Sequence, residues 1–140
     1  MIKADKNHLI PEGWVLQKHL ETFSGQAGPY YFREHGDAGV GFVPEEHHLN
    51  LAQLVHGGAL LTLADMSLFD ICFRELGMFH GLTVTLNSEF VGAGKPGVFT
   101  MATGEITKVG GSLIFARGLI TAEGTTLMSF SGTLKRLRKK

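Results

Sequence analysis

The segment from Asn50 to Asp65 combines residue types that could stabilise a charged reaction intermediate. Two adjacent glycines, Gly57 and Gly58, open a long apolar stretch with the composition of a helix. The first N–H groups of a helix have no partner within it, and the helix dipole adds partial positive charge there. Such groups can bind a carbonyl oxygen as it becomes negatively charged, and glycine allows close approach. The alternative is a flexible helix start with His56 near the N-cap.

Asp65 lies inside this apolar stretch, between Ala64 and Met66. A carboxylate is costly to bury unless it is paired or functional. Burial would raise the pKa of this carboxyl and suit it to act as a general base. Alternatively, Asp65 faces a polar gap or a neighbouring chain. Asp70 and Arg74 are four residues apart and can form an ordinary ion pair.

The elements that would position these residues are one long helix and several strands. Residues 57–76 are apolar nearly all round, which predicts a buried helix about 30 Å long, and Gly77 follows as its cap. Alternating apolar segments separated by glycine-bearing turns predict strands at residues 30–33, 38–44, 82–91, 98–109, 112–122 and 125–137. We therefore expect an α+β domain, with an antiparallel sheet of five to six strands curled around the helix.

The 140 residues suit one domain, with a polar leader over residues 1–27 that packs on or near the domain, a single domain over 28–137 and a basic tail over 138–140. The leader could contain a short helix near residues 14–20. The formal charge is zero, so neither nucleic acid nor a membrane surface is an expected partner. A single cysteine and an N-terminus unlike a signal peptide predict a cytoplasmic protein.

Other motifs are weaker. Residues 92–97 have the spacing GxGxxG, but a strand follows them where a dinucleotide site needs a helix. His47, His48 and His56 could be proposed as metal ligands, but no set of Cys, His and carboxylate has zinc spacing. Cys72 has no adjacent histidine and fits a structural thiol. We therefore expect no metal and no cofactor.

The combination of Asn50, His56-Gly57-Gly58 and Leu63-Ala64-Asp65 resembles the hotdog-fold thioesterases, specifically the phenylacetic-acid-degradation (PaaI-like) type of acyl-CoA thioesterase. Gly28-Pro29-Tyr30 also resembles the start of a strand in that family, and the resemblance extends over residues 28–137. It implies a hotdog fold, in which a sheet wraps a central helix. It also implies hydrolysis of acyl-CoA to free acid and coenzyme A by a homodimer with composite sites, which in this family often pairs into a homotetramer.

The resemblance implies roles for individual residues. The Gly57 N–H, with help from Asn50, would polarise the thioester carbonyl. His56 would orient the site and the substrate, and Asp65 would act as general base or as nucleophile. Thr83 stands where related enzymes carry a Ser or Thr that holds the water.

Further residues are candidates for substrate contact. Gly58 would lie beside the reacting carbonyl, and Met66 and Phe69 would line the acyl pocket. The coenzyme A phosphates would need cations. The basic candidates are Lys95, Lys108, Arg117, Arg136 and Arg138, although a solvated surface charge is the commoner role for each.

Helix geometry favours a site shared between two chains. His56 and Asp65 are nine residues apart, so on one helix they are separated by about 13 Å along the axis and lie on opposite faces. A two-fold partner could bring its Asp65 beside Gly57. The alternatives are a hotdog hydratase or dehydratase, whose motif is absent, a non-catalytic acyl-CoA sensor, and a structural oligomerising domain.

Overall fold

The structure is a computed structural model that describes residues 7–138. In chain order its elements are η1 (Asn7–Leu9), β1 (Trp14–Leu16), α1 (Phe23–Ala27), β2 (Tyr31–Arg33), β3 (Val40–Phe42), η2 (Glu46–His48), α2 (Gly57–Leu76), β4 (Gly81–Phe90), β5 (Thr100–Val109), β6 (Leu113–Ala122) and β7 (Thr125–Arg136). The expectations for residues 1–6 and 139–140 lie outside the described residues.

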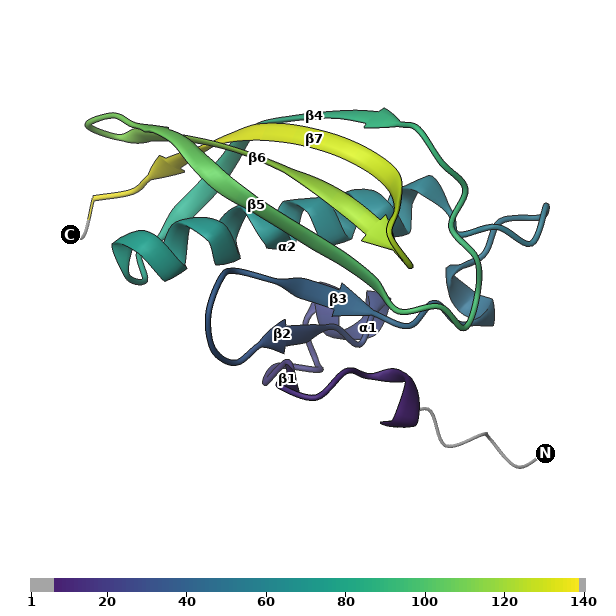
Figure 1. Cartoon of the computed structure of the whole chain (residues 1–140). Coiled ribbons are helices and arrows are strands. Elements are labelled where there is room, and N and C mark those ends of the chain that lie inside the picture. Colours follow the sequence, from purple (N-terminus) through teal and green to yellow (C-terminus); the bar gives the residue numbers. More distant parts are fainter. Residues whose placement is uncertain (1–6, 139–140) are drawn as a thin grey trace.

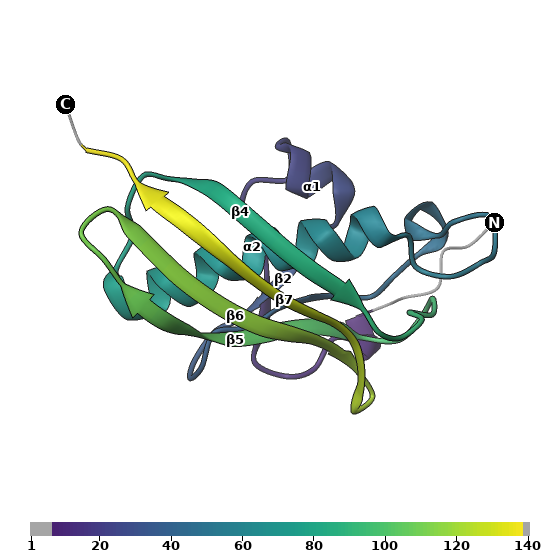
Figure 2. The ribbon, with the colours of Figure 1, turned by 90° about the horizontal axis from the view of Figure 1, so that it is seen from above.

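All the strands form one antiparallel sheet in the order β1-β2-β3-β5-β6-β7-β4. The long strands β4 to β7 curve over α2, and the short strands β1 to β3 continue the sheet past the opposite side of α2 (Figure 1). Seen from above, β4 crosses over α2, and α1 lies beside α2 (Figure 2). The predicted α+β architecture, a sheet wrapped around one central helix, is confirmed.

The sheet has seven strands rather than the predicted five to six, because the N-terminal segment adds one. β1 pairs with β2 as an edge strand, so the short helix expected near residues 14–20 is wrong. The Trp14 ring packs edge-on against Phe99, with 5.0 Å between ring centroids, and the Arg33 guanidinium lies 5.1 Å over it. These contacts with distant residues favour the extended backbone. Part of the expected leader therefore belongs to the sheet.

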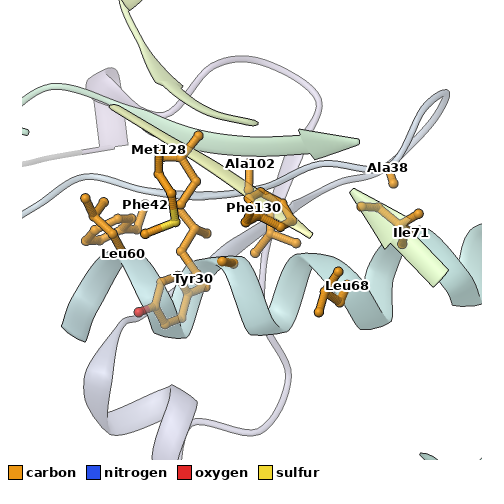
Figure 3. Packing of buried hydrophobic residues seen from close by; sticks show 14 of the residues in the cluster. Tyr30, Ala38, Phe42, Leu60, Leu68, Ile71, Ala102, Met128 and Phe130 are labelled. Atoms are coloured by element: carbon orange, nitrogen blue, oxygen red, sulfur yellow. The ribbon is translucent and has the colours of Figure 1, made fainter. Parts of the chain in front are cut away.

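α2 spans the predicted residues, and Gly77 ends it with a φ of 81°, a conformation that glycine adopts without strain. One side of α2 packs beneath the sheet (Figure 3). Each large apolar side chain buried there contributes about 1.5–3 kcal/mol. No helix in the described part of the chain is long and apolar enough to cross a membrane. The buried residues of α2 are Leu60, Leu63, Ala64, Ser67, Leu68, Ile71 and Cys72.

Glycines in the long strands let the sheet come close to α2. A Cβ added at Gly104 of β5 would lie 2.8 Å from Ile71 Cδ1, and one added at Gly132 of β7 would overlap the Leu68 side chain. Larger residues at these two positions would force the sheet away from the helix. The close packing fixes the height of α2 beneath the strands, and with it the side chains that α2 presents.

Two neighbouring surfaces lack cover in a single chain. Contrary to the expectation of a helix buried nearly all round, Leu61, Asp65, Met66 and Phe69 of α2 are only partly buried. β4 pairs with β7 along one edge, and no strand of residues 7–138 lies along its other edge. Its exposed apolar residues include Leu82, Val84 and Phe90. An unpaired edge of this kind is a template for another strand.

Candidate active site

A short loop delivers the chain to the start of α2. Leu49 and Val55 form an antiparallel bridge that closes the loop. The Asn50 N–H donates to the Leu54 carbonyl at 2.8 Å, and Asn50 Oδ1 accepts the N–H groups of Ala52 (2.9 Å) and Leu54 (3.2 Å). The side-chain oxygen of Asn50 therefore holds the loop in shape. Its Nδ2 group has no hydrogen-bond partner among the described residues and remains a donor for a ligand.

His56 is the N-cap of α2 and occupies most of the free N–H groups at this helix end. Its Nδ1 accepts the Gly58 N–H at 2.8 Å, and its carbonyl accepts the N–H groups of Ala59 (2.9 Å) and Leu60 (3.3 Å). Within residues 7–138, the N–H of Gly57 has no acceptor. The expectation that both glycine N–H groups are free is therefore wrong for Gly58. A single N–H, at the positive end of the helix, faces outward.

Phe90, at the end of β4, lies against this N–H-bearing residue, a contact that sequence reasoning missed. A Cβ added at Gly57 would lie 3.2 Å from Phe90 Cε1 and 3.3 Å from Phe90 Cζ. Glycine is therefore the residue that leaves room for the ring. A single aromatic at the end of a strand carries no sequence signal that relates it to a helix start more than 30 residues earlier.

Asp65 lies at the opposite end of β4 and is hydrogen-bonded to it. The hydroxyl of Thr83 donates to Asp65 Oδ1 at 2.6 Å. Asp65 is half-buried rather than enclosed by the helix, because it faces a groove beside α2. A hydroxyl donor at this distance fixes the orientation of the carboxyl group. The structure thus brings together Asp65 and Thr83, which the sequence assigned to one site.

The groove beside Asp65 has a volume of about 750 Å³ and is mainly apolar. Met66 and Phe69, the predicted acyl-pocket residues, both line it. Two of its rim residues are strongly exposed in a single chain, Phe23 at 76% and Met78 at 87%. The complete lining is Thr22, Phe23, Ser24, Phe32, Leu61, Thr62, Asp65, Met66, Phe69, Asp70, Phe73 and Met78.

The structure does not bring all predicted residues to one place in one chain. His56 caps α2 and Asp65 lies within the same helix, so they are about 13 Å apart along its axis. We call the group around Gly57, with His56, Asn50 and Phe90, the amide half-site. The group around Asp65, with Thr83 and the groove, is the carboxylate half-site.

Among the basic candidates, Lys95 lies nearest the amide half-site. Its neighbour Gly94 accepts the Val55 N–H at 2.9 Å, and a Cβ at Gly94 would lie 2.9 Å from Val55 Cβ. Gly92 and Gly94 of the GxGxxG spacing therefore serve close packing, whereas Gly97 has open space around it and a φ of 80°, and strand β5 follows them as predicted. Lys108 pairs with Phe115 near the far end of β5, about 26 Å along the strand from its start.

Two of the three arginine candidates have partners in the chain. Arg117 donates to Glu105 Oε1 from Nη2 at 2.8 Å across the exposed face of the sheet. Arg136 Nη2 donates to the Gly110 carbonyl at 3.2 Å. Arg138 lies exposed at the end of the described chain. These contacts fit surface roles better than phosphate binding.

Asp70, also on α2, forms the expected ion pair with Arg74, at 3.4 Å. Burial raises the pKa of Asp70, and Arg74 opposes this effect. Arg74 in turn donates to the carbonyls of Gly36 and Arg33, which tie the turn between β2 and β3 to the helix. The Asp70 pair therefore stabilises the fold, in contrast to Asp65.

The described residues contain no group of three His, Cys, Asp or Glu side chains placed to hold a metal ion. The His47 ring lies 3.1 Å from the Gly28 carbonyl, and His48 also bonds to carbonyls of this turn. Cys72 is fully buried, and burial raises the pKa of its thiol to about 11. A thiol with so high a pKa is a poor nucleophile.

Comparison with known proteins identifies the family of this chain. The sequence model of the Thioesterase superfamily matches residues 52–129, which include both half-site segments of α2. The chain is 26% identical over 126 residues to a Pseudomonas aeruginosa protein named "Putative esterase PA0474", covering 88% of this chain and 94% of that one.

Solved structures share the fold. The PaaI protein from the phenylacetic acid degradation operon of E. coli superposes with a TM-score of 0.68 at 23% identity, covering 74% of each chain. The BH2602 protein from Bacillus halodurans, solved with CoA, gives a TM-score of 0.71 at 26% identity, covering 79% of this chain and 74% of that one. The hotdog fold implied by the resemblance is thus confirmed. The chain belongs to the thioesterase superfamily, and its general chemistry is the hydrolysis of thioesters.

Proposed function

We propose that this protein hydrolyses acyl-CoA thioesters to a free acid and coenzyme A, at sites formed by two copies of the chain. The observation that carries the proposal is the Gly57 N–H, which has no acceptor in the described chain and lies at the positive end of α2. The other N–H groups of this first turn are occupied, so this one is oriented and available. It suits a thioester oxygen that becomes negative.

The carboxylate half-site supplies the base in this proposal. Asp65 takes a proton from a water molecule as the water oxygen attacks the thioester carbonyl carbon. The resulting oxyanion is held by the Gly57 N–H of the other subunit, with Asn50 Nδ2 as a second donor. The C–S bond then breaks with its electron pair on sulfur, and the thiolate takes the proton from Asp65. The Thr83 hydroxyl, bonded to Asp65 Oδ1, orients the carboxylate so that Oδ2 faces the water.

The edge of β4 supports the shared site. Phe90 and Thr83 lie on the same strand, β4. Phe90 is at the amide half-site, and Thr83 is at the carboxylate half-site. If two β4 edges pair antiparallel about a two-fold axis at Asn87, each Asn87 lies opposite its own copy, and Val84, the neighbour of Thr83, lies opposite the partner's Phe90. Each carboxylate half-site then meets an amide half-site of the other subunit. The same pairing would cover the exposed apolar residues of β4.

The choice of coenzyme A as thiol rests on a relative and on one position in the structure. The Bacillus halodurans structure contains CoA. In this chain, Lys95 follows Gly94 in the turn that packs against Val55. Val55 directly precedes His56, the N-cap of α2. A phosphate-bearing thiol that leaves from the amide half-site would pass this ammonium group.

A panel of acyl-CoAs with short, long and aromatic acyl groups tests the activity. Thiol release is followed for the wild type and for Asp65→Asn. We expect turnover by the wild type only. Absence of turnover across the panel would overturn the enzyme proposal, and binding without turnover would favour an acyl-CoA sensor. Hydration of an unsaturated acyl-CoA without thiol release would favour a hydratase.

Mixed dimers test the shared site. Asp65→Asn chains are unfolded and refolded together with Gly57→Pro chains, which lack the N–H of residue 57. A mixed dimer then holds one complete site, so activity returns although each parent is inactive. If mixed dimers form, as verified by mass spectrometry, and stay inactive, the site is not shared.

The strand pairing has its own test. Asn87→Cys places a thiol close to the proposed two-fold axis, where a disulfide between subunits can form on oxidation. Ser131→Cys is the matched control, because Ser131 pairs with Asn87 but lies one strand inward. Cross-linking of both variants, or of neither, would contradict this register. Native mass spectrometry of the wild type distinguishes a dimer from a tetramer.

A further inference from the structure

The imidazole of His48 is a buried hydrogen-bonding group that the proposed chemistry does not use. It is 4% exposed and lies eight residues before His56. Its Nε2 lies 2.6 Å from the Ala27 carbonyl and 3.2 Å from that of Gly28, and its Nδ1 accepts the Glu45 N–H at 2.8 Å. Because Nδ1 is an acceptor, the ring is neutral and carries its proton on Nε2.

These contacts join the two half-sites within one chain. Ala27 is the last residue of α1, whose first turn borders the groove beside Asp65. The main-chain carbonyl of His48 accepts the N–H of His56 at 2.8 Å, and His56 directly precedes Gly57. One residue therefore holds the groove wall through its ring and the helix start through its backbone.

The ring of His48 is also fixed by packing. It lies edge-on to Phe42, with 4.9 Å between centroids, and its centroid lies 3.8 Å from that of His47, with the two rings tilted by 40°. Phe42 in turn contacts Tyr30 at 5.3 Å. Phe42, Tyr30 and Leu60 of the first turns of α2 belong to the same buried apolar cluster (Figure 3). A displaced His48 ring would therefore disturb the packing under the helix start as well as the hydrogen bonds.

We propose that neutral His48 is a positioning residue, which holds the Gly57 N–H at a fixed place relative to the groove wall of α1. Its relevance to turnover rests on the proposed thioester hydrolysis, but its effect on the helix start does not. The Nε2–H makes the main contact, because it ties down the end of α1 at the groove wall, and Nδ1 adds a second bond to the Glu45 backbone at the start of η2.

Protonation of His48 would weaken this arrangement. Once Nδ1 carries a proton, it can no longer accept the Glu45 N–H. Burial lowers the pKa of His48 from its usual 6.5, and the neighbouring His47 lowers it further, while the Ala27 and Gly28 carbonyls and Glu45 oppose this. Because the folded-state pKa is the lower one, the associated stability is complete above about pH 6.5 and falls as the pH decreases toward the folded-state pKa.

Three variants test the proposal. His48→Phe keeps a ring of similar size and removes both nitrogens, whereas His48→Gln keeps a donor near the position of Nε2. His35→Gln is the control, because the His35 side chain is 90% exposed. Each protein is assayed at a temperature at which circular dichroism shows it fully folded. The backbone resonance and hydrogen exchange of the Gly57 amide are measured alongside kcat and KM.

We expect His48→Phe to lower kcat about tenfold with a smaller change in KM, since a misplaced catalytic group slows the reaction of bound substrate. The Gly57 amide should shift and exchange faster, and His48→Gln should recover most of both properties. The pH dependence is measured in a His56→Asn background, which removes the imidazole next to Gly57. There, acidification should move the Gly57 amide resonance with a midpoint below pH 6.5, and adding His48→Gln should abolish this pH-dependent shift.

Two results would overturn the proposal. One is a His48→Phe protein of lower Tm whose kcat and Gly57 amide are unchanged, which would make His48 merely stabilising. The other is a His48→Gln protein as impaired as His48→Phe. The amide measurements need no substrate, so they remain decisive even if the protein hydrolyses no acyl-CoA.

Discussion

The amide half-site and the carboxylate half-site differ in how the chain holds them. At the amide half-site, backbone and side-chain hydrogen bonds of Asn50, His56 and His48 fix the loop and leave one N–H free. At the carboxylate half-site, Asp65 has one hydrogen bond within the described residues, from Thr83, and borders a groove with exposed rim residues. The hydrogen bonds of the amide half-site are complete within a single chain, whereas the groove of the carboxylate half-site is an open, partly exposed surface.

The difference suggests a division of labour. A donor for an oxyanion must be fixed before the charge develops, so a rigid, backbone-built region suits it. A groove that takes acyl groups can instead be closed by the partner and the substrate together. Changes at the amide half-site should therefore act mainly on kcat, and changes along the groove should also act on KM.

The largest expected effect is at the carboxylate half-site. Asp65→Asn should lower kcat by about 10³-fold, within the usual range for loss of a general base, because the amide still accepts the Thr83 hydroxyl but cannot take a proton. Asp70→Asn is the matched control on the same helix, and it should change thermal stability far more than kcat. Steady-state kinetics with the best acyl-CoA measure both. Equal losses of kcat in the two variants would contradict the assignment of Asp65.

At the amide half-site, Gly57→Pro and Gly57→Ala form a matched pair. Both add a Cβ near Phe90, but only proline removes the N–H, and proline is well suited to the first position of a helix. His56 already has the extended backbone (ψ 137°) that a following proline needs. We expect kcat to fall about 10²-fold for proline and much less for alanine. Similar losses in both would point to crowding by Phe90, which a Phe90→Leu companion variant would relieve.

The hydrogen bond between Thr83 and Asp65 should have an intermediate effect. Thr83→Val keeps the shape of the side chain and removes the donor to Asp65 Oδ1. Loss of a hydrogen bond to a charged group costs about 1.5 kcal/mol, which corresponds to a decrease in kcat of about tenfold. Thr83→Ser should retain nearly full activity. If valine and serine behave alike, the hydroxyl does not orient the carboxylate.

The regular parts of the molecule could be predicted from sequence because their signals are long. The apolar run over residues 57–76 with Gly77 after it, and four alternating segments separated by glycine turns, each contain many consistent positions. The three residues of β1 are too few to show a period, and Trp14 is held extended by Phe99 and Arg33, which are distant in sequence. That strand was therefore missed.

The positions of the candidate site residues in the fold could be predicted from sequence, but their hydrogen bonds could not. The spacing of Asn50, His56-Gly57-Gly58 and Asp65 indicated the two ends correctly as parts of one helix start and one helix interior. It could not show that the His56 ring takes the Gly58 N–H, or that Phe90 covers Gly57, because both depend on side-chain directions in three dimensions. The partial exposure of Asp65 likewise depends on what covers α2, which a sequence pattern does not state.

The smallest expected effect concerns the phosphates of coenzyme A. It compares a lysine beside the amide half-site with a lysine far from it. Lys95 lies beside the amide half-site and is exposed, whereas Lys108 lies near the far end of β5. An exposed ammonium group contributes at most about 1 kcal/mol to phosphate binding. Lys95→Gln should therefore raise KM for acyl-CoA about threefold at low salt, and the difference should shrink in 0.5 M salt, where the Debye length is roughly 4 Å. With an acyl thioester that lacks the nucleotide part of coenzyme A, Lys95→Gln should leave KM unchanged, because no phosphate is present to contact. Lys108→Gln is the control, because Lys108 lies far from Gly57 within its own chain. A larger effect on KM from Lys108→Gln than from Lys95→Gln would place the coenzyme A phosphates at the other end of the sheet, away from the amide half-site.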